Sequence, residues 1–577
     1  QTCALPILNK NRKIREFLIL GAGVLCLGFF SFFFWKDSLK KEKAEGKETE
    51  ISEKDREKSW EEAAHTPYGA YPETVYYTLG KISGRDNSNL PAGDTYEDNG
   101  YTRYLRKMLN IQNEDVFELE EGSQYEEAVE MAVKDKNMPD ILVVKGRDTL
   151  QKLAREGRIE DLTAVYETCT TPRIKEMYES YSHGLLDSAR FEGRLYGFPD
   201  TVIDHGPTLL WMRKDWLDKL GLQEPESMED AMACIGKFVE KDLAGNGETI
   251  GLACNTQLVT GSNAKYSADG IFTMFHAKPR KWIAGESGEI TYGSVTEETK
   301  CALAYMNSLY TKGILDSKFL LRTEDNLTEL IAEGKCGAFF GKWWAPNNPL
   351  MQSYDRDKEA VWKPYFLTEE DENQVQEYET YDDTLYVAVR KGYEHPEIPA
   401  KYISVIFDYS RYDDGNANEV NEYFSLNVDP TARPMNINVD YKDALYRTTR
   451  HIREALEGEK KPEALSGLEK SYYTTCKAYL DGSLTTANAW AAYTSRITAV
   501  GLLADSGFET AQSLPLQGEN PGPEEDLLKL EQQTFIQIIC GEKPVGYFDT
   551  FVKEWYAAGG KEITQKARTA VKEEKES

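Results

Sequence analysis

The feature that most constrains this chain is the stretch at 193–222, GRLYGFPDTVIDHGPTLLWMRKDWLDKLGL. Its first half, up to Pro207, mixes aromatic residues with Gly and Pro, which predicts an extended segment followed by a loop or crossing. The second half opens with an apolar run at 209–212, which predicts a buried strand. A helix should follow, capped by Asp215, beginning at Trp216 and ending at Gly221. The stretch therefore predicts a crossing segment that leads into a strand and a helix.

The residue pattern of this stretch resembles the hinge crossing of the extracellular solute-binding proteins of ABC transporters, the large lipoprotein type associated with sugar uptake. Residues 196–199 match the YGxP part of that pattern, and 211–222 match its LWxRKDWLDKLGL part. The resemblance implies an α/β, two-lobed fold of the periplasmic-binding-protein type II class, with the ligand cleft between the lobes. The chain would leave lobe one here and enter lobe two, and we predict that Asp200 and Trp211 contact the ligand.

The length of the chain predicts more than one hydrophobic core, and its charge argues against a nucleic-acid partner. At 577 residues the chain exceeds the size at which a single core keeps growing, so two or more cores are expected. The 97 acidic residues outnumber the 68 Lys and Arg, which gives a net charge of −29 and argues against a nucleic-acid partner. The 34 Tyr, 22 Phe and 10 Trp can stack on sugars as well as fill a core.

Several kinds of catalytic and metal site are absent from the sequence. The nine cysteines include no C-x-x-C pair, and the six histidines form no H-E-x-x-H motif. Neither a zinc site nor a dense disulfide framework is therefore expected. Because G-x-S-x-G and Walker motifs are also missing, we predict that the chain is not an enzyme.

The N-terminal region predicts attachment to a membrane. Residues 1–7 are typical of a sequencing artefact and are excluded, which leaves a short cytoplasmic segment up to residue 16. The uncharged run at 17–35 is long enough to cross a bilayer, and its aromatic end before Lys36 favours an uncleaved anchor over a signal segment. The location on the extracellular face is what the resemblance implies. Lipidation at Cys26 is the disfavoured alternative because Leu25, which precedes it, is not small. A charged tether at 36–72 and a charged tail at 565–577 complete the ends.

Lobe one shows alternating strands and helices. A strand at 75–83 precedes a polar loop that ends at Asn99 and a helix that starts near Tyr101; a helix at 125–133 then leads to a strand at 139–144. Such alternation favours a parallel-type sheet, whose ligands lie beyond the carboxyl ends of its strands. The predicted cleft residues are Asn99, Lys145, Arg147 and Asp148.

The segment at 241–252 resembles a calcium loop with an incomplete ligand set. Asp242 and Asn246 keep ligand positions of such a loop, and Glu248 adds a nearby carboxylate. Ala244, however, stands where an oxygen ligand belongs, and Ala253 stands at the position of the last carboxylate. Calcium at Asp242, Asn246 and Glu248 is therefore the disfavoured alternative to having no cofactor.

A second constellation follows at 326–350. Apolar residues at helical spacing predict a helix that Gly334 ends, followed by a strand at 337–340 and a loop that carries Trp343 and Trp344. The segment resembles the sugar-binding family, in which an E-G-K strand precedes a Trp-bearing loop. The resemblance implies that Trp343, and secondarily Trp344, stacks on the ligand.

The resemblance extends over about 73–564 and implies a return crossing. The run 381–389 predicts a strand that returns to lobe one, and Tyr381 at its start is a further ligand candidate. Lobe one would comprise about 73–198 and a return segment from about 381. Lobe two would comprise about 208–380 and the C-terminal helices.

Three functions remain open at this stage. The leading hypothesis is a monomeric, membrane-tethered receptor that captures an oligosaccharide or related polar solute and presents it to the permease subunits of an ABC transporter. A glycan-active enzyme is an alternative, since paired carboxylates suffice for glycoside hydrolysis, but no spacing singles out a pair. A ligand sensor for a membrane signalling partner would use the same fold.

Overall fold

The computed structural model describes residues 53–84, 90–120, 122–181, 184–201, 207–245, 247–259, 265–284, 289–367, 384–425, 428, 430–507, 523 and 525–576. The predicted anchor at 17–35, Cys26, Tyr381 and Asn246 lie outside these residues. None of the helices in the described ranges has the length and apolarity needed to cross a bilayer. The chain separates into two compact units, Gln1–Lys58 and Ser59–Ser577, and both large sheets belong to the second.

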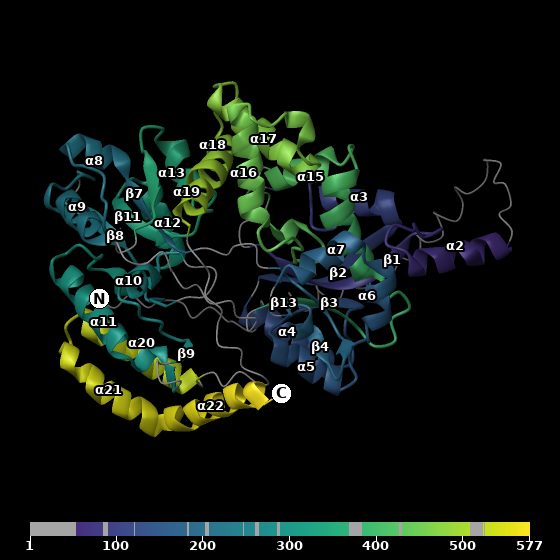
Figure 1. Ribbon diagram of the computed structural model, residues 1–577, viewed down its shortest axis with the longest axis horizontal. Helices are drawn as coiled ribbons and strands as arrows, with labels where there is room; N and C mark the ends of the chain where they lie inside the picture. Colours follow the sequence, from purple (N-terminus) through teal and green to yellow (C-terminus); the bar gives the residue numbers. More distant parts are fainter. Residues whose placement is uncertain are drawn as a thin grey trace, which may run out of the picture. The chain divides into compact units, whose positions relative to one another are not determined.

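The sheet of lobe one has five strands in the order β2-β1-β3-β13-β6. Figure 1 labels β1, β2, β3 and β13 of this sheet. Strand β1 is parallel to β2 and β3, whereas β13 is antiparallel to both of its neighbours. The parallel pairing within this sheet is the arrangement that the alternation of strands and helices predicts. The sheet is mixed because β13, which follows the lobe-two strands in the sequence, enters in the opposite direction. Its strands are β1 (Val75–Ser83), β2 (Ile111–Glu120), β3 (Ile141–Lys145), β6 (Phe198–Pro199) and β13 (Leu385–Val389).

Helices cover this sheet through aromatic and aliphatic side chains. Tyr125 shows how closely α4 is fixed, because its hydroxyl donates to the carbonyl oxygens of Gly80 in β1 and Val143 in β3. The neighbouring elements are α3 (Gly100–Leu109), α4 (Ser123–Lys134), α5 (Arg147–Arg155), α6 (Thr163–Cys169), α7 (Pro172–Glu179), η1 (Asp187–Ala189) and the hairpin of β4 (Arg190–Phe191) and β5 (Arg194–Leu195).

The sheet of lobe two has the order β12-β7-β11-β8. Strand β7 is antiparallel to β11 and β12, and β11 is parallel to β8. The predicted strand at 209–212 and the predicted strand at 337–340 are thus adjacent strands of this sheet. The elements are β7 (Leu209–Arg213), α8 (Lys214–Leu220), α9 (Met228–Glu240), β8 (Ile250–Ala253), α10 (Asp269–Met274), η3 (Phe319–Leu321), α12 (Glu324–Ala332), β11 (Cys336–Gly341), α13 (Leu350–Arg356) and β12 (Trp362–Tyr365).

The helix after β7 begins at Lys214, two residues earlier than the sequence predicts. Arg213 occupies the N-cap position, and Asp215 lies in the first turn, so the prediction that Asp215 caps the helix is wrong. The reason is a competing partner: the Asp215 carboxylate accepts two hydrogen bonds from the Arg213 guanidinium, at 2.7 and 2.6 Å. The predicted stop is confirmed, because Gly221 takes the left-handed conformation with a φ of 64°.

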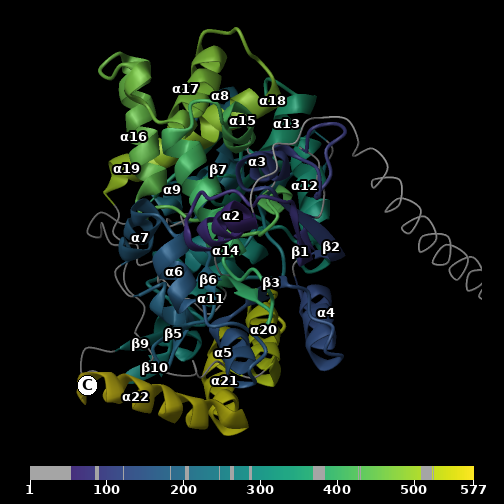
Figure 2. The same ribbon diagram turned by 90° about the vertical axis from the view of Figure 1, so that its right-hand side faces the viewer.

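The C-terminal helices complete the core of lobe two. Trp555 of α21 stacks on Tyr292 of β10 with ring centroids 5.0 Å apart, and Arg568 of α22 donates to the carbonyl oxygen of Ile290. Figure 2 shows these helices beside the β9–β10 hairpin. The segment predicted as a charged tail from residue 565 lies within α22. The elements are β9 (Trp282–Ala284), β10 (Ile290–Tyr292), η2 (Gly293–Val295), α11 (Glu297–Thr311), α20 (Glu525–Ile539), η8 (Val545–Tyr547), α21 (Phe548–Trp555), η9 (Tyr556–Gly560) and α22 (Lys561–Glu576).

A helical region at 398–506 contacts the cores of both lobes. Its first elements, up to η5, belong to the core of lobe one. In the later part, Leu445, Trp490 and Val500 join a core that contains Phe339 of β11. The elements are α14 (Ile398–Ile403), the π-helix η4 (Ser404–Asp413), α15 (Asn418–Ser425), η5 (Pro430–Ala432), α16 (Ala444–Glu457), η6 (Pro462–Ala464), α17 (Gly467–Leu480), α18 (Ala487–Tyr493), the π-helix η7 (Thr494–Ala499) and α19 (Val500–Ser506).

The end of helix α2 (Glu53–His65) is docked on lobe one by a buried lysine. The Lys401 ammonium on α14 donates to the carbonyl oxygens of Ala63 and Thr66, both at 2.7 Å. Burial lowers the pKa of Lys401 to about 8. The sequence predicts a tether as far as residue 72, whereas the structure assigns residues from Ser59 onward to the folded unit. The high charge of the segment concealed a few residues, Ala63 among them, that pack against lobe one.

We therefore expect a chain that begins at Glu73 to be much less stable than one that begins at Glu53. Removing residues 53–72 takes both carbonyl acceptors from Lys401, and a buried charge that loses its partners costs about 3–5 kcal/mol. Urea unfolding of the two chains measures the difference. Lys401→Met in both chains is the control, since it should reduce the difference by removing the stranded charge. Equal unfolding free energies for the two original chains would contradict the docking.

Candidate functional site

Three chain segments meet where the chain passes between the two sheets. Immediately after β6, the Asp200 amide donates to the carbonyl oxygen of Leu385 and the Thr201 amide donates to that of Asn438, both at 2.8 Å. Side chains add further bonds: Asp200 Oδ1 accepts from the Asn438 amide at 2.5 Å, and Thr201 Oγ1 accepts from the Asp440 amide at 3.0 Å. The outgoing segment, the returning strand and the segment that leads to α16 are thus bonded together.

Asp200, predicted as a ligand residue, is a central member of this junction. Its backbone and one carboxylate oxygen hold two other segments in place. Residues 202–206, which follow it, lie outside the described residues. The structure therefore gives Asp200 a role in joining the crossings.

Asn99 is fully buried and caps helix α3. Its Oδ1 accepts from the amides of Tyr101 and Thr102, and its Nδ2 donates to the carbonyl oxygens of Thr95 and Ala432, both at 2.9 Å. Because both ends of the amide are engaged, Asn99 fixes the loop and the segment around residue 432 rather than presenting a free group.

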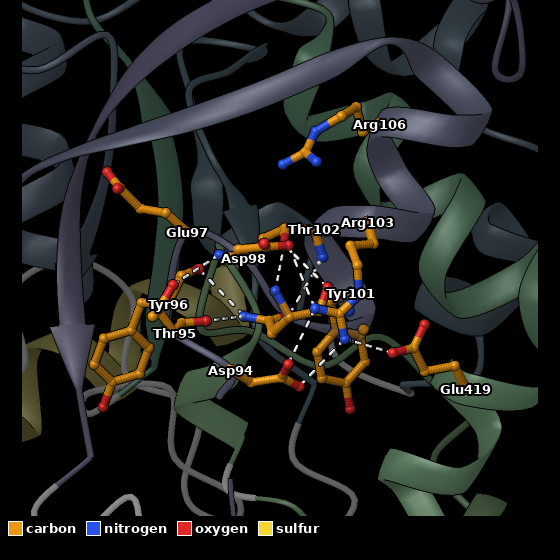
Figure 3. Close-up of polar contacts among 12 residues, drawn as sticks. Asp94, Thr95, Tyr96, Glu97, Asp98, Tyr101, Thr102, Arg103, Arg106 and Glu419 are labelled. Atoms are coloured by element: carbon orange, nitrogen blue, oxygen red, sulfur yellow. Dashed lines mark hydrogen bonds and ion pairs between the residues drawn. The ribbon is translucent and has the colours of Figure 1, made fainter. Parts of the chain in front are cut away.

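An ion-pair network stabilises the same loop. The Arg103 guanidinium contacts Asp94 at 3.0 Å, Asp98 at 3.3 Å and Glu419 of α15 (Figure 3). Burial alone would raise the pKa of Asp94, but hydrogen bonds from Arg103 and Tyr423 lower it below its usual value. The network therefore keeps the carboxylate ionised and ties the loop to α15.

The predicted residues after β3 lie at the carboxyl end of that strand. Lys145 is its last residue, and the Gly146 amide donates to the carbonyl oxygen of Thr384, next to the returning strand. Arg147 opens α5 and lies over the Phe191 ring, with 4.9 Å between its Cζ and the ring centroid. Asp148 is exposed to solvent.

The three candidate tryptophans differ in exposure. Trp211 is completely buried, and its indole nitrogen donates to the carbonyl oxygen of Lys342 at 3.2 Å, so the structure gives it a packing role. Trp343 has 7% of its surface exposed, and Trp344 is partly exposed. The Lys265 ammonium lies 5.8 Å from the Trp344 ring centroid. These side chains bring β7, β11 and the following loop into one aromatic cluster.

Two residues near Trp343 were missed in the sequence. Arg496 of η7 lies over the Trp343 ring, with 5.0 Å between its Cζ and the ring centroid. Tyr472 of α17 lies on the same guanidinium at 4.1 Å. No local pattern could have identified them, because both are far from residue 343 in the chain and only the helical region brings them there.

The calcium-type loop is closed by its own hydrogen bonds. Asp242 Oδ2 accepts from the Gly247 amide at 2.7 Å, and Oδ1 accepts from the Thr249 hydroxyl at 2.6 Å. Glu248 pairs with Lys318 at 3.1 Å, and no group of three candidate metal ligands occurs within the ranges that the structure describes. With Ala244 at a ligand position, the described residues of this loop supply fewer side-chain oxygens than a calcium loop of this type uses.

A comparison with known protein families assigns this chain to one of them. The family model described as bacterial extracellular solute-binding protein matches residues 89–403. The chain belongs to this family. The match includes β2, β3, β6 and β13 of the first sheet, all four strands of the second sheet, and the two segments at Asp200 and Leu385. This solute-binding protein therefore shares with its family the two segments that run between the sheets.

Curated relatives match this solute-binding protein over part of their length. The lipoprotein LipO of Bacillus subtilis is 24% identical over 220 residues, which are 37% of this chain and 41% of LipO. The fructooligosaccharide ABC transporter substrate-binding protein FusA of Streptococcus pneumoniae is 24% identical over 253 residues, 40% of this chain and 45% of FusA. The chain thus spans less than half the length of either relative in these alignments.

A solved structure supports the fold over a larger share of the chain. The alginate-binding protein AlgQ2, determined without calcium ion, covers 87% of this chain and 98% of its own, with a TM-score of 0.56 and 12% sequence identity. At this identity the likeness concerns the fold, which is α/β and two-lobed as the sequence predicts.

We expect Trp343→Ala to reduce affinity for the bound oligosaccharide at least about tenfold, because stacking and buried area are lost together. Its burial adds a loss of stability of about 3–5 kcal/mol. The matched control is Trp216→Ala, since Trp216 packs edge-on against Phe238 in lobe two and should cost similar stability without changing affinity. Calorimetric titration and thermal melts separate the effects. Unchanged affinity in Trp343→Ala would direct the search to Trp344.

Removal of calcium should leave stability nearly unchanged. The oxygens of Asp242 are already engaged by Gly247 and Thr249, so an ion would have to displace existing hydrogen bonds. Thermal unfolding with millimolar calcium or with a chelator measures this. A calcium-dependent rise of several degrees in the midpoint would show that the loop binds the ion, through linkage of binding to folding.

Proposed function

We propose that this solute-binding protein captures an oligosaccharide or a related polar solute outside the cell and presents it to the permease subunits of an ABC transporter. The observation that carries the proposal is the family match across both lobes and their crossings. The relative FusA is a substrate-binding protein of a fructooligosaccharide ABC transporter, which supports a carbohydrate as the ligand class.

The fold supports a mechanism in which the lobes close on the ligand. Each sheet has its own hydrophobic core, and the bonded segments around Asp200, Leu385 and Asn438 connect them. Rotation about such a junction can enclose a ligand while leaving both cores intact. Trp343, on a loop that follows β11, would supply the flat apolar face for a sugar ring.

The proposal includes location and partners. The protein would act as a monomer on the extracellular face of the membrane, held by the N-terminal segment at 17–35, with lipidation at Cys26 as the disfavoured alternative. Its net charge of −29 disfavours nucleic acid as a partner. No cofactor is proposed.

Binding without chemical change is the decisive test. The chain from Glu53 onward should bind one class of oligosaccharide in a panel of fructans, pectic fragments and milk oligosaccharides, measured by titration calorimetry. Chromatography after prolonged incubation should recover that oligosaccharide intact, because the sequence holds no recognised catalytic motif. Hydrolysis products that disappear when one carboxylate is replaced would identify an enzyme instead.

A further inference from the structure

Arg496 is a buried cation held between two aromatic rings. It lies in the π-helix η7, and its residue surface is 7% exposed. Its guanidinium lies over both Tyr472 and Trp343, at 4.1 and 5.0 Å from the ring centroids. Cation–π contacts of this kind offset part of the cost of burying the charge.

Arg496 has no carboxylate partner among the described residues, in contrast to the buried Arg213 and Arg411. Arg213 contacts Asp215 at 2.6 Å, and Arg411 contacts Asp440 at 2.7 Å. A buried charge without a counter-charge is expensive, so these pairs are the usual arrangement. The carboxylate of α17 is engaged elsewhere, because Glu469 pairs with His451 at 2.7 Å.

A neighbouring thiol does not supply the missing negative charge. Burial raises the pKa of the Cys476 thiol on α17 to about 12, although the charge of Arg496 opposes this shift. Cys476 is therefore a neutral thiol at physiological pH. The positive charge of Arg496 remains uncompensated by any nearby anion in the part of the chain that is described.

The nitrogen atoms of Arg496 leave hydrogen-bonding capacity unused. Nη2 donates to the Tyr472 hydroxyl at 2.8 Å, while Nε is enclosed and has no acceptor among the described residues. Nη1 likewise has no acceptor within the described ranges. A guanidinium offers planar pairs of donors that fit the two oxygens of a carboxylate, and this one has donors to spare.

We propose that Arg496 and Trp343 form a subsite for an acidic sugar, in which the guanidinium binds the carboxylate of a uronic acid unit and the indole stacks on its ring. This inference rests on the proposed function and narrows it to acidic oligosaccharides. The planar carboxylate is favoured over a sulfate ester because its two oxygens match the planar fork of the guanidinium.

The overall charge of the protein makes this local cation important. A net charge of −29 repels an anionic ligand at long range, but salt screens such repulsion beyond roughly 8 Å at physiological ionic strength. At contact distance, the attraction between a ligand carboxylate and a partly desolvated guanidinium is stronger than the repulsion from distant carboxylates of the protein. Arg496 would thus decide between an acidic oligosaccharide and its neutral counterpart.

The test compares trigalacturonate with its fully methyl-esterified form, which keeps the sugar rings and removes the charge. Titration calorimetry with the chain from Glu53 onward should show at least about tenfold tighter binding of the acid. Arg496→Gln should abolish this preference while leaving affinity for the ester within about threefold. Arg496→Lys, which keeps the charge and loses the fork, should fall between them.

Arg433→Gln is the matched control. Arg433 is also 7% exposed and has no carboxylate partner among the described residues, but it lies over Phe407 and Phe424 instead of Trp343. We expect this variant to lose stability in thermal melts and to retain the preference for the acid. If it loses that preference as Arg496→Gln does, the assignment to Arg496 is overturned.

The remaining outcomes separate this inference from the proposed function. Equal binding of acid and ester by the original chain, or tight binding of neutral oligosaccharides alone, would refute the acidic subsite and leave oligosaccharide capture standing. Tighter binding of a sulfated galactan trimer than of trigalacturonate would refute the carboxylate assignment. Failure of every oligosaccharide in the panel to bind would refute capture itself, and the subsite with it.

Discussion

The hydrogen bonds that join Asp200 and Thr201 to Leu385 and Asn438 are the interaction on which the two-lobed arrangement depends. Each bond links two chain segments. These segments connect sheets or helical layers that have separate cores. A single crossing would leave the lobes free to twist about one strand. Several bonded crossings restrict their relative movement to directions that bend all of them together, which is the requirement for a defined closing motion.

Buried lysine ammonium groups also fix the positions of chain segments in lobe one. Lys81 of β1 is fully buried and donates to the carbonyl oxygens of Arg433 and Pro434, among others, and it lies over the Tyr96 ring. Lys401 is bonded in the same manner to the end of α2. In both cases backbone carbonyls replace water around the cation, so the position of a whole segment is set by one side chain. The segment fixed by Lys81 leads directly into the crossing at Asn438.

The sequence was most informative where a pattern is local. Strands β1, β7 and β11 and the stop at Gly221 follow from hydrophobic runs and glycine positions within a few residues, and the structure confirms them. Strand β2 escaped notice because it is an edge strand whose polar residues mask the periodicity. The position of Asp215 was misjudged because Arg213 competes for its carboxylate. Packing around Trp343 could not be predicted, because it depends on Arg496 from a distant helical region.

The interleaving of the two lobes along the chain sets the order in which they can be completed. Lobe one needs β13 in its sheet and residues up to Val439 in its core, although it begins near residue 60. Lobe two needs Phe535 and Trp555, near the end of the chain. Neither core can therefore close while the ribosome is still making the first half of the protein. Such late closure keeps the nascent chain in an unfolded state for longer, and an unfolded chain is the form that can be threaded through a narrow export channel before it folds on the far side.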